Sequence, residues 1–232
     1  MENNKNNNQK QISGAIIIAG LIIAGAILLK GSTAVAPTAQ DNKNADLKDI
    51  KITPVTNEDH ILALGNSKVV VVEYSDSECP FCKIFQGTMH KIVTKYDGKV
   101  AWVYRDYPIA QLHPKSFHES VAMECAALQG GNEAFWKYTD ELYVRTTSNN
   151  RLDVAELPKI AESIGLDLTS FNGCLTNEKT KATVQADMDS GNSAGVNGTP
   201  KSFILKNGKV VDTIDGAEPI ESVTQKIDAA LK

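Results

Sequence analysis

The residues with the clearest chemical potential are Cys79 and Cys82, which enclose a Pro-Phe dipeptide in a C-x-x-C pair. A β-branched run at 69–74 precedes them, and a stretch typical of a helix follows them at 80–96. Unpaired backbone N–H groups and the helix dipole favour a thiolate at a helix N-terminus. The pattern predicts thiol–disulfide exchange, with Cys79 as the exposed nucleophile and Cys82 as the buried resolving thiol.

Other chemistries of a cysteine pair have less support in this sequence. A zinc site needs a second pair of ligands, whereas Cys125 and Cys174 stand alone and the 4 histidines form no such pair. A strained C-x-x-C rarely serves as a purely structural disulfide. A tethered Cu(I)-delivery module would hold the ion between both thiolates, but no His or Met lies nearby to complete the site. A binding module with an inert pair is a further alternative, and we predict no metal and no cofactor.

The elements that must position the pair follow a β-α-β order. The run at 69–74 predicts a strand covered on both faces, and 100–104 predicts a second strand parallel to it. The segment 80–96 between them carries a helical apolar stripe. A short helix is also expected at 57–64, because Asn57 is a suitable N-cap.

Helical patterns then fill the region from about 113 to 192. This is too long for a simple crossover between strands, so it predicts a helical insertion with a break at Gly130-Gly131. Strands at 200–205 and 209–214, joined by an Asn-Gly turn, predict a β-hairpin. The segment 220–231 predicts a closing amphipathic helix.

The N-terminal region predicts a membrane anchor. Residues 1–11 form a polar tail that we expect to be cytoplasmic, and 12–29 are apolar enough to cross a bilayer. The segment 30–54 reads as a flexible linker. A cleaved signal peptide is the alternative, because 34–36 resembles a small-x-small cleavage site. We expect the folded body, 55–232, to lie outside the cytoplasm.

Composition limits the class of partner. The 232 residues are 42% hydrophobic and carry a net charge of -4, which suits one domain with an insertion. The mild acidity and the scattered lysines argue against a protein that binds nucleic acid.

Several segments resemble the DsbA-like branch of the thioredoxin superfamily, in particular tethered or secreted forms of the BdbD type. Together they cover about 55–232: VVVEYSDSECPFCK at 70–83, RDYP at 105–108, LHP at 112–114, ECAALQG at 124–130, FW at 135–136 and GVNGTP at 195–200. The resemblance implies an α/β chain, a thioredoxin fold with a helical insertion between a β-α-β half and a C-terminal β-β-α half.

The resemblance also implies the activity and its partners. Such proteins introduce disulfide bonds into reduced exported polypeptides, and a membrane partner of the DsbB or VKOR type reoxidises them. A disulfide isomerase or reductase of the same fold is the alternative.

Further site residues follow from the same resemblance. The Thr199-Pro200 bond is expected to be cis and to expose the Thr199 backbone for pairing with an extended substrate, beside Phe81. Glu73 is expected to be a buried acid that relays the proton of Cys82, because burial raises the pKa of a carboxyl group. The alternative for Glu73 is a strand-end side chain that reaches solvent.

Some residues near the pair depart from the best-known DsbA proteins. No histidine lies between the cysteines, so Phe81 gives the thiolate neither charge nor a hydrogen bond. Glu73, Asp76 and Glu78 add negative charge nearby, which opposes a thiolate. His113 lies in a predicted loop, where a histidine is usually solvated, and only the resemblance makes it a candidate.

Cys125 and Cys174 lie on the apolar faces of two predicted helices of the insertion. Two buried free thiols are one possibility, since cysteine is often fully buried. Outside the cytoplasm we expect a structural disulfide between them instead.

Overall fold

The structure is a computed structural model that describes residues 47, 49–63, 65 and 67–232. These residues belong to one compact unit, Asn42–Lys232. The predicted cytoplasmic tail, 1–11, and the predicted membrane-spanning segment, 12–29, lie outside the described residues. Within the described part of the chain, no helix has the length and apolar character that crossing a membrane requires.

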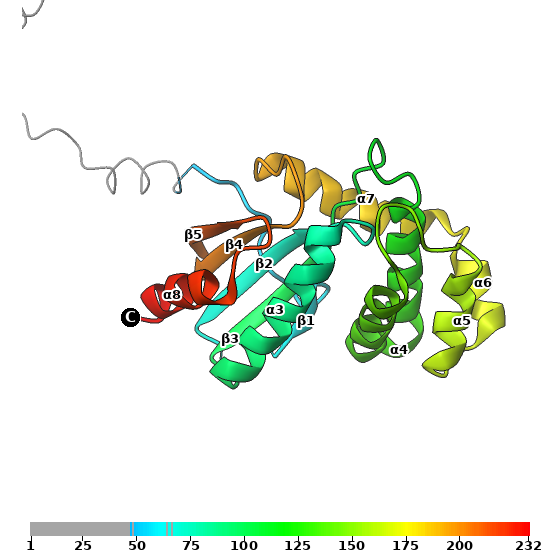
Figure 1. Cartoon of the computed structure of the whole chain (residues 1–232), viewed down its shortest axis with the longest axis horizontal. Helices are drawn as coiled ribbons and strands as arrows, with labels where there is room; N and C mark the ends of the chain where they lie inside the picture. The colour runs from blue at the N-terminus through cyan, green and yellow to red at the C-terminus, as the bar shows by residue number, and fades with distance from the viewer. Residues whose placement is uncertain (1–46, 48, 64, 66) are drawn as a thin grey trace, which may run out of the picture. The chain divides into compact units, whose positions relative to one another are not determined.

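A five-stranded sheet forms the centre of this unit (Figure 1). The bounds of its strands are His60–Leu62 for β1, Val69–Ser75 for β2, Val100–Asp106 for β3, Lys201–Lys206 for β4 and Lys209–Asp215 for β5. Their order in the sheet is β1-β3-β2-β4-β5. The strands β2 and β3 run parallel, as predicted, and the other neighbours are antiparallel. Asn207 and Gly208 both have positive φ, which suits the Asn-Gly turn of the predicted hairpin.

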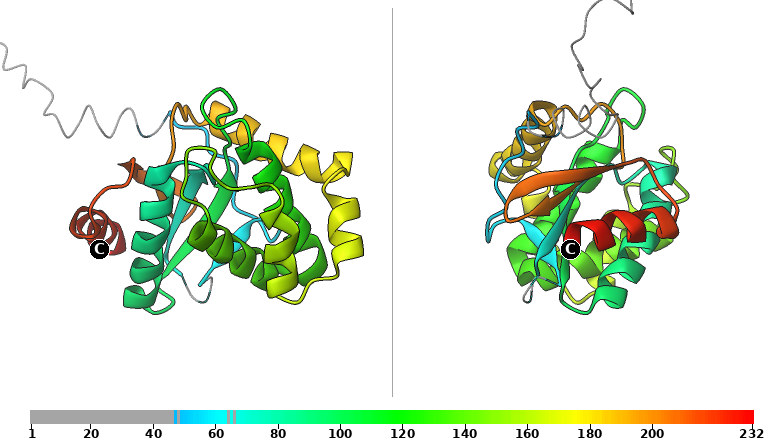
Figure 2. Two further views of the ribbon diagram at one scale, coloured as in Figure 1. Left: turned by 45° about the vertical axis from the view of Figure 1, so that its right-hand side comes forward. Right: turned by 90° about the vertical axis from the view of Figure 1, so that its left-hand side faces the viewer.

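Two helices cover one face of the sheet, α3 at Pro80–Tyr96 and α8 at Ile220–Leu231 (Figure 2). Side chains alternate between the faces along a strand. Val69 and Val71 of β2 therefore point into the larger apolar cluster beneath these helices, whereas Val72 belongs to a smaller cluster on the opposite face. Both faces of β2 are covered, as its apolar run predicts.

The smaller cluster is extended by the chain that leads into the sheet. Ile50 and Ile52, which fall within the predicted linker, are half-buried against it. The packed part of the chain therefore includes residues before position 55.

The helical insertion separates β3 from β4 (Figure 1). Its helices are α4 at Ser116–Arg145, α5 at Glu156–Ser163, α6 at Leu168–Cys174 and α7 at Glu178–Ser193. Gly131 has non-helical dihedral angles (φ 66°, ψ -161°), so α4 consists of two helical segments that meet at the predicted break. The predicted order of a β-α-β half, a helical insertion and a β-β-α half is confirmed.

The predicted short helix at 57–64 is wrong. His60–Leu62 instead forms β1, which pairs antiparallel with β3 and places His60 opposite Tyr104. A strand of this length has too few residues to show a period, so its partner strand decides its conformation rather than its own sequence.

Candidate active site

Cys79 is the N-cap residue of α3, directly after β2 and a short turn. Pro80 occupies the first helical position, where a missing N–H leaves no bond unmade. Cys79 is only 5% exposed, so the nucleophile is far less accessible than the sequence predicts. Cys82, one turn further along, is fully buried, as expected.

The Cys79 thiol is acidified by its surroundings. A hydrogen bond from the Cys82 side chain lowers the pKa of Cys79 to about 6, and the backbone N–H groups of Cys82 and Phe81 act in the same direction against the opposing effect of burial. These backbone groups are among the donors that a helix N-terminus leaves unpaired. Cys79 is therefore mainly a thiolate at neutral pH.

The Cys82 thiol has the opposite character. Burial raises the pKa of Cys82 well above its usual value, and the neighbouring Cys79 raises it further. The backbone N–H of Asp76 donates to the Cys82 Sγ at 3.4 Å. One thiol of the pair is thus charged while the other keeps its proton, which is the asymmetry that the sequence predicts.

Glu73 is fully buried and lies on the same face of β2 as Val71, beneath α3. Trp102 Nε1 donates to Glu73 Oε2 at 2.9 Å. Burial raises the pKa of Glu73 to about 8, so the carboxyl group holds a proton near neutrality. The structure contains the predicted buried acid, and its role as a relay stays a proposal.

The segment before β4 completes the site. The Thr199-Pro200 peptide bond is cis, as predicted. The register of β4 places Lys201 opposite Tyr74 near the end of β2, so this segment lies beside the start of α3. The Cys79 Sγ lies 3.4 Å from the Thr199 carbonyl oxygen, to which it donates when the thiol is protonated. A hollow of about 240 Å³ adjoins this segment. Phe81, two residues after Cys79, is 60% exposed.

This geometry agrees with a known family. The family model described as thioredoxin matches residues 56–229. The chain belongs to the thioredoxin family.

Solved structures place this thioredoxin domain in the DsbA-like branch. DsbA2 of Pseudomonas aeruginosa is 26% identical, with a TM-score of 0.61 over 77% of this chain and 96% of that chain. Oxidised BdbD of Bacillus subtilis has a TM-score of 0.67 at 20% identity, over 79% of this chain and 98% of that chain. The α-DsbA1 of Wolbachia pipientis has a TM-score of 0.65 at 21% identity, over 77% of this chain and 93% of that chain. The domain is therefore a DsbA-like thiol–disulfide oxidoreductase in fold.

Curated relatives are much longer proteins. The Na⁺/H⁺ antiporter NhaA 1 of Mycolicibacterium gilvum is 30% identical over 153 residues, which are 65% of this chain and 24% of the relative. NhaA 3 of Salinispora tropica is 31% identical over 69% of this chain and 23% of its own length. The thioredoxin-family chain thus spans about a quarter of these relatives, and the antiport in their names is a property of those proteins.

His113 of this thioredoxin domain is buried, so the expectation of a solvated loop histidine is wrong. It is 7% exposed, and its Nδ1 donates to Asp76 Oδ2 at 3.0 Å. The loop before α4 folds against the turn that carries Cys79, and a carboxylate of that turn binds the ring. No spacing pattern joins positions 76 and 113, so only the tertiary fold brings them together.

A group of three acids was not predicted from the sequence. Carboxylate oxygens of Asp106, Glu124 and Asp187 all lie within 4.8 Å of one another. Oxygen-only ligands of this kind suit hard cations such as Mg²⁺ or Ca²⁺. Burial raises the pKa of Asp106, and it raises that of Asp187 to about 7, so protons on these groups relieve their mutual repulsion.

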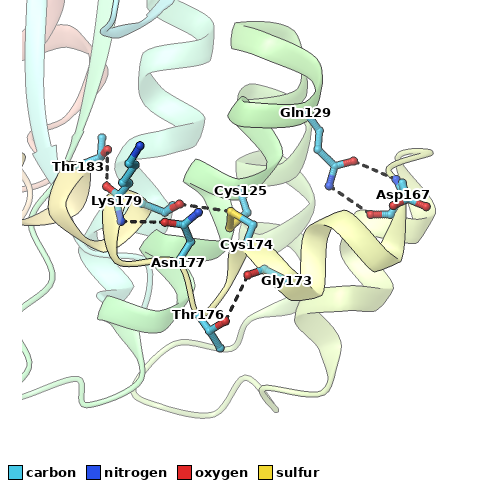
Figure 3. The surroundings of a disulfide bond; sticks show 10 residues. Cys125, Gln129, Asp167, Gly173, Cys174, Thr176, Asn177, Lys179 and Thr183 are labelled. Atoms are coloured by element: carbon cyan, nitrogen blue, oxygen red, sulfur yellow. Dashed lines mark hydrogen bonds between the residues drawn. A yellow bond between two sulfur atoms is a disulfide. The ribbon is translucent and has the colours of Figure 1, made fainter.

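The structure contains the predicted disulfide between Cys125 and Cys174 (Figure 3). It joins α4 to α6 with a Cα–Cα distance of 5.7 Å. Beside it, the Gln129 side-chain amide bonds the backbone N–H and carbonyl of Asp167 at 3.1 and 3.2 Å. The second cysteine pair therefore fastens two helices of the insertion and takes no part in the site around Cys79.

Proposed function

We propose that this chain is an extracytoplasmic thiol–disulfide oxidoreductase that introduces disulfide bonds into exported proteins. One observation carries the proposal: Cys79 has a pKa of about 6 at the start of α3, beside a buried Cys82 whose pKa is raised. A thiol with a low pKa leaves readily from a mixed disulfide and stabilises the reduced pair. A pair whose reduced form is stabilised passes its disulfide on to other proteins.

The first step would use the oxidised pair. A substrate thiolate attacks Cys79 Sγ, the Cys79–Cys82 bond breaks, and a mixed disulfide forms between the substrate and Cys79. Cys82 leaves as a thiolate and takes up a proton, because burial disfavours its charged form. Glu73, which holds a proton near neutrality on the strand beneath, would supply or relay it.

The second step would release the product. A second substrate thiolate attacks the substrate sulfur of the mixed disulfide, which forms the substrate disulfide and expels Cys79 as a thiolate. The substrate has lost two electrons and the cysteine pair has gained them. Reoxidation needs a partner that accepts these electrons, and we propose a membrane protein of the DsbB or VKOR type.

The surface around Cys79 suits an unfolded chain. Phe81 and Ile84 are 60% and 61% exposed on α3, one helical turn apart. Thr199 contacts the Cys79 sulfur, and a hollow lies beside Thr199 and Pro200. An extended peptide would pair with the Thr199 backbone while its apolar side chains contact the exposed side chains of α3.

The cellular location belongs to the same proposal. An anchor at 12–29 would tether the domain outside the cytoplasm, with 1–11 inside and the linker between the anchor and the sheet. Disulfides persist in such compartments, and the Cys125–Cys174 bond supports this placement.

Two measurements test the proposed direction of electron flow. We expect the Cys79–Cys82 pair to equilibrate with glutathione at a potential well above that of thioredoxin, about -270 mV, and toward that of DsbA, about -120 mV. We also expect the oxidised protein to form disulfides in a reduced, unfolded protein substrate. A potential near that of thioredoxin, without oxidation of the substrate, would assign the chain to the reductases or isomerases instead.

A further inference from the structure

The turn between β2 and Cys79 is built from polar residues that are fully buried. Asp76, Ser77 and Glu78 each have 0% exposure, and charged groups are rarely buried without partners. Ser77 Oγ donates to Glu119 Oε2 of α4 at 2.6 Å. Glu78 Oε2 accepts the backbone N–H of Asn150 at 2.6 Å. The helical insertion therefore holds the turn that carries the nucleophile.

Asp76 is the member of this turn that contacts both cysteines. Its backbone N–H donates to Cys82 Sγ at 3.4 Å, and its carbonyl oxygen accepts the backbone N–H of Cys79 at 3.1 Å. A donor aimed at sulfur stabilises it most when the sulfur is negatively charged. The position of Asp76 thus affects how well Cys82 leaves as a thiolate when the disulfide opens.

The Asp76 carboxylate is fixed by three donors. The backbone N–H of Glu78 donates to Oδ1 at 2.9 Å, and that of Ile109 donates to Oδ2 at 2.7 Å. The third donor, His113 Nδ1, belongs to a side chain, whereas the other two are backbone groups, and it donates to Oδ2 at 3.0 Å. The acceptor is a carboxylate, so the proton of the imidazole lies on Nδ1.

His113 is itself held at the start of the insertion. Its backbone N–H donates to the Ile109 carbonyl at 2.9 Å. Its carbonyl oxygen accepts from the N–H and the Oγ of Ser116, at 3.0 and 2.8 Å. The ring therefore reaches Asp76 from a fixed backbone, and little entropy is lost in making the bond.

We infer that His113 is a positioning residue for the exchange reaction, which acts through Asp76. Its bond holds the Asp76 backbone N–H against the Cys82 sulfur and partly neutralises the Asp76 charge beside the pair. The inference rests on the proposed function. It means that the helical insertion, through His113, contributes to the reduction potential of the Cys79–Cys82 pair. Loss of the bond destabilises the reduced pair and shifts the equilibrium with glutathione toward the oxidised form.

The test compares variants of the full chain by two readouts, the equilibrium constant for reduction by glutathione and the Cys79 pKa from thiolate absorbance. We expect His113→Ala to lower the constant about tenfold, equivalent to about 30 mV, and to raise the Cys79 pKa. His113→Asn restores a donor near the place of Nδ1, so it keeps both values close to wild type. His113→Gln puts its donor near the place of Nε2, away from Asp76, and behaves like alanine.

His60→Ala is the matched control. His60 is a half-buried histidine bonded to a carboxylate, with Nε2 at 2.8 Å from Glu124 Oε1, and among the described residues it has no hydrogen bond to the turn before Cys79. We expect it to lower the melting temperature while leaving the glutathione equilibrium unchanged. This control separates a local effect on the pair from a general loss of stability.

Several results would overturn the inference. A wild-type equilibrium in His113→Ala would do so, as would equal shifts in His113→Ala and His60→Ala. If the alanine variant does not fold, identical values for the asparagine and glutamine variants would overturn it as well. A wild-type protein that does not exchange with glutathione at all would refute the proposed function itself, and with it the role of His113.

Discussion

The chain contains two cysteine pairs, which differ in their position in the fold, in their bonding and in their surroundings. Cys79 and Cys82 are free thiols one helical turn apart, at the start of α3. Cys125 and Cys174 are 49 positions apart and joined by a disulfide within the insertion. The comparison teaches that position in the secondary structure, more than the presence of a thiol, decides whether a cysteine reacts.

The surroundings explain the difference. Cys79 is contacted by backbone donors of a helix N-terminus and by the Thr199 carbonyl, so its protonation state is adjustable. Cys125 lies within the first helical segment of α4 and belongs to the large apolar cluster, with 0% exposure. Its sulfur is bonded to Cys174 of α6, and this disulfide holds α4 to α6.

The largest effect in this comparison is expected from Cys79. Cys79→Ala should abolish disulfide exchange with a dithiol peptide, because the other free thiol among the described residues, Cys82, is fully buried and has a raised pKa. Cys82→Ala keeps the low-pKa nucleophile and should accumulate a mixed disulfide, detectable by mass spectrometry. Exchange at an undiminished rate in Cys79→Ala would contradict the assignment of the nucleophile.

The second pair should matter for stability alone. Replacing Cys125 and Cys174 together by alanine removes a cross-link between positions 49 residues apart, and loop-closure entropy gives a loss of roughly 4 kcal/mol of unfolding free energy. Urea denaturation measures this loss. The glutathione equilibrium of Cys79–Cys82 should stay at its wild-type value under native conditions, and a shift would show that the two pairs are coupled.

A smaller effect is expected from Glu73, whose pKa is raised by burial from 4.5 to about 8. The native state binds an extra proton between these values, so stability should fall as pH rises through this window. Glu73→Gln removes that dependence and should stabilise the protein by roughly 4 kcal/mol at pH 8, with little effect at pH 4.5. Urea unfolding at both pH values, with Cys79 and Cys82 replaced by alanine, isolates the effect of burial.

Glu133→Gln is the control for this measurement. Glu133 is exposed, and its bond to Lys137 lowers its pKa, so the substitution should give no stabilisation that grows with pH. A Glu73→Gln variant with the wild-type pH dependence would mean that Glu73 is ionised in the folded protein.

Much of the fold could be predicted because its elements are long or carry strong local signals. The helix at 80–96 and the closing helix at 220–231 have the predicted bounds, since each shows an apolar stripe and a clear start. The break at Gly131 and the turn at Asn207-Gly208 could be predicted because glycine and asparagine adopt a positive φ at a lower energetic cost than other residues. The strand β1 could not be predicted, because pairing with β3 defines it and its own sequence shows no local period.

The sequence by itself determined where reactive sulfur lies, because a C-x-x-C after a strand and before a helix fixes both thiols relative to one helix terminus. Only the tertiary structure decided what surrounds that sulfur. The register of β4 on β2 brings Thr199 to Cys79, and the insertion brings His113 to Asp76. Contacts between such distant positions have no spacing that a sequence could show. Burial, which sets the pKa values of Glu73 and Cys82, exists only once all layers have packed.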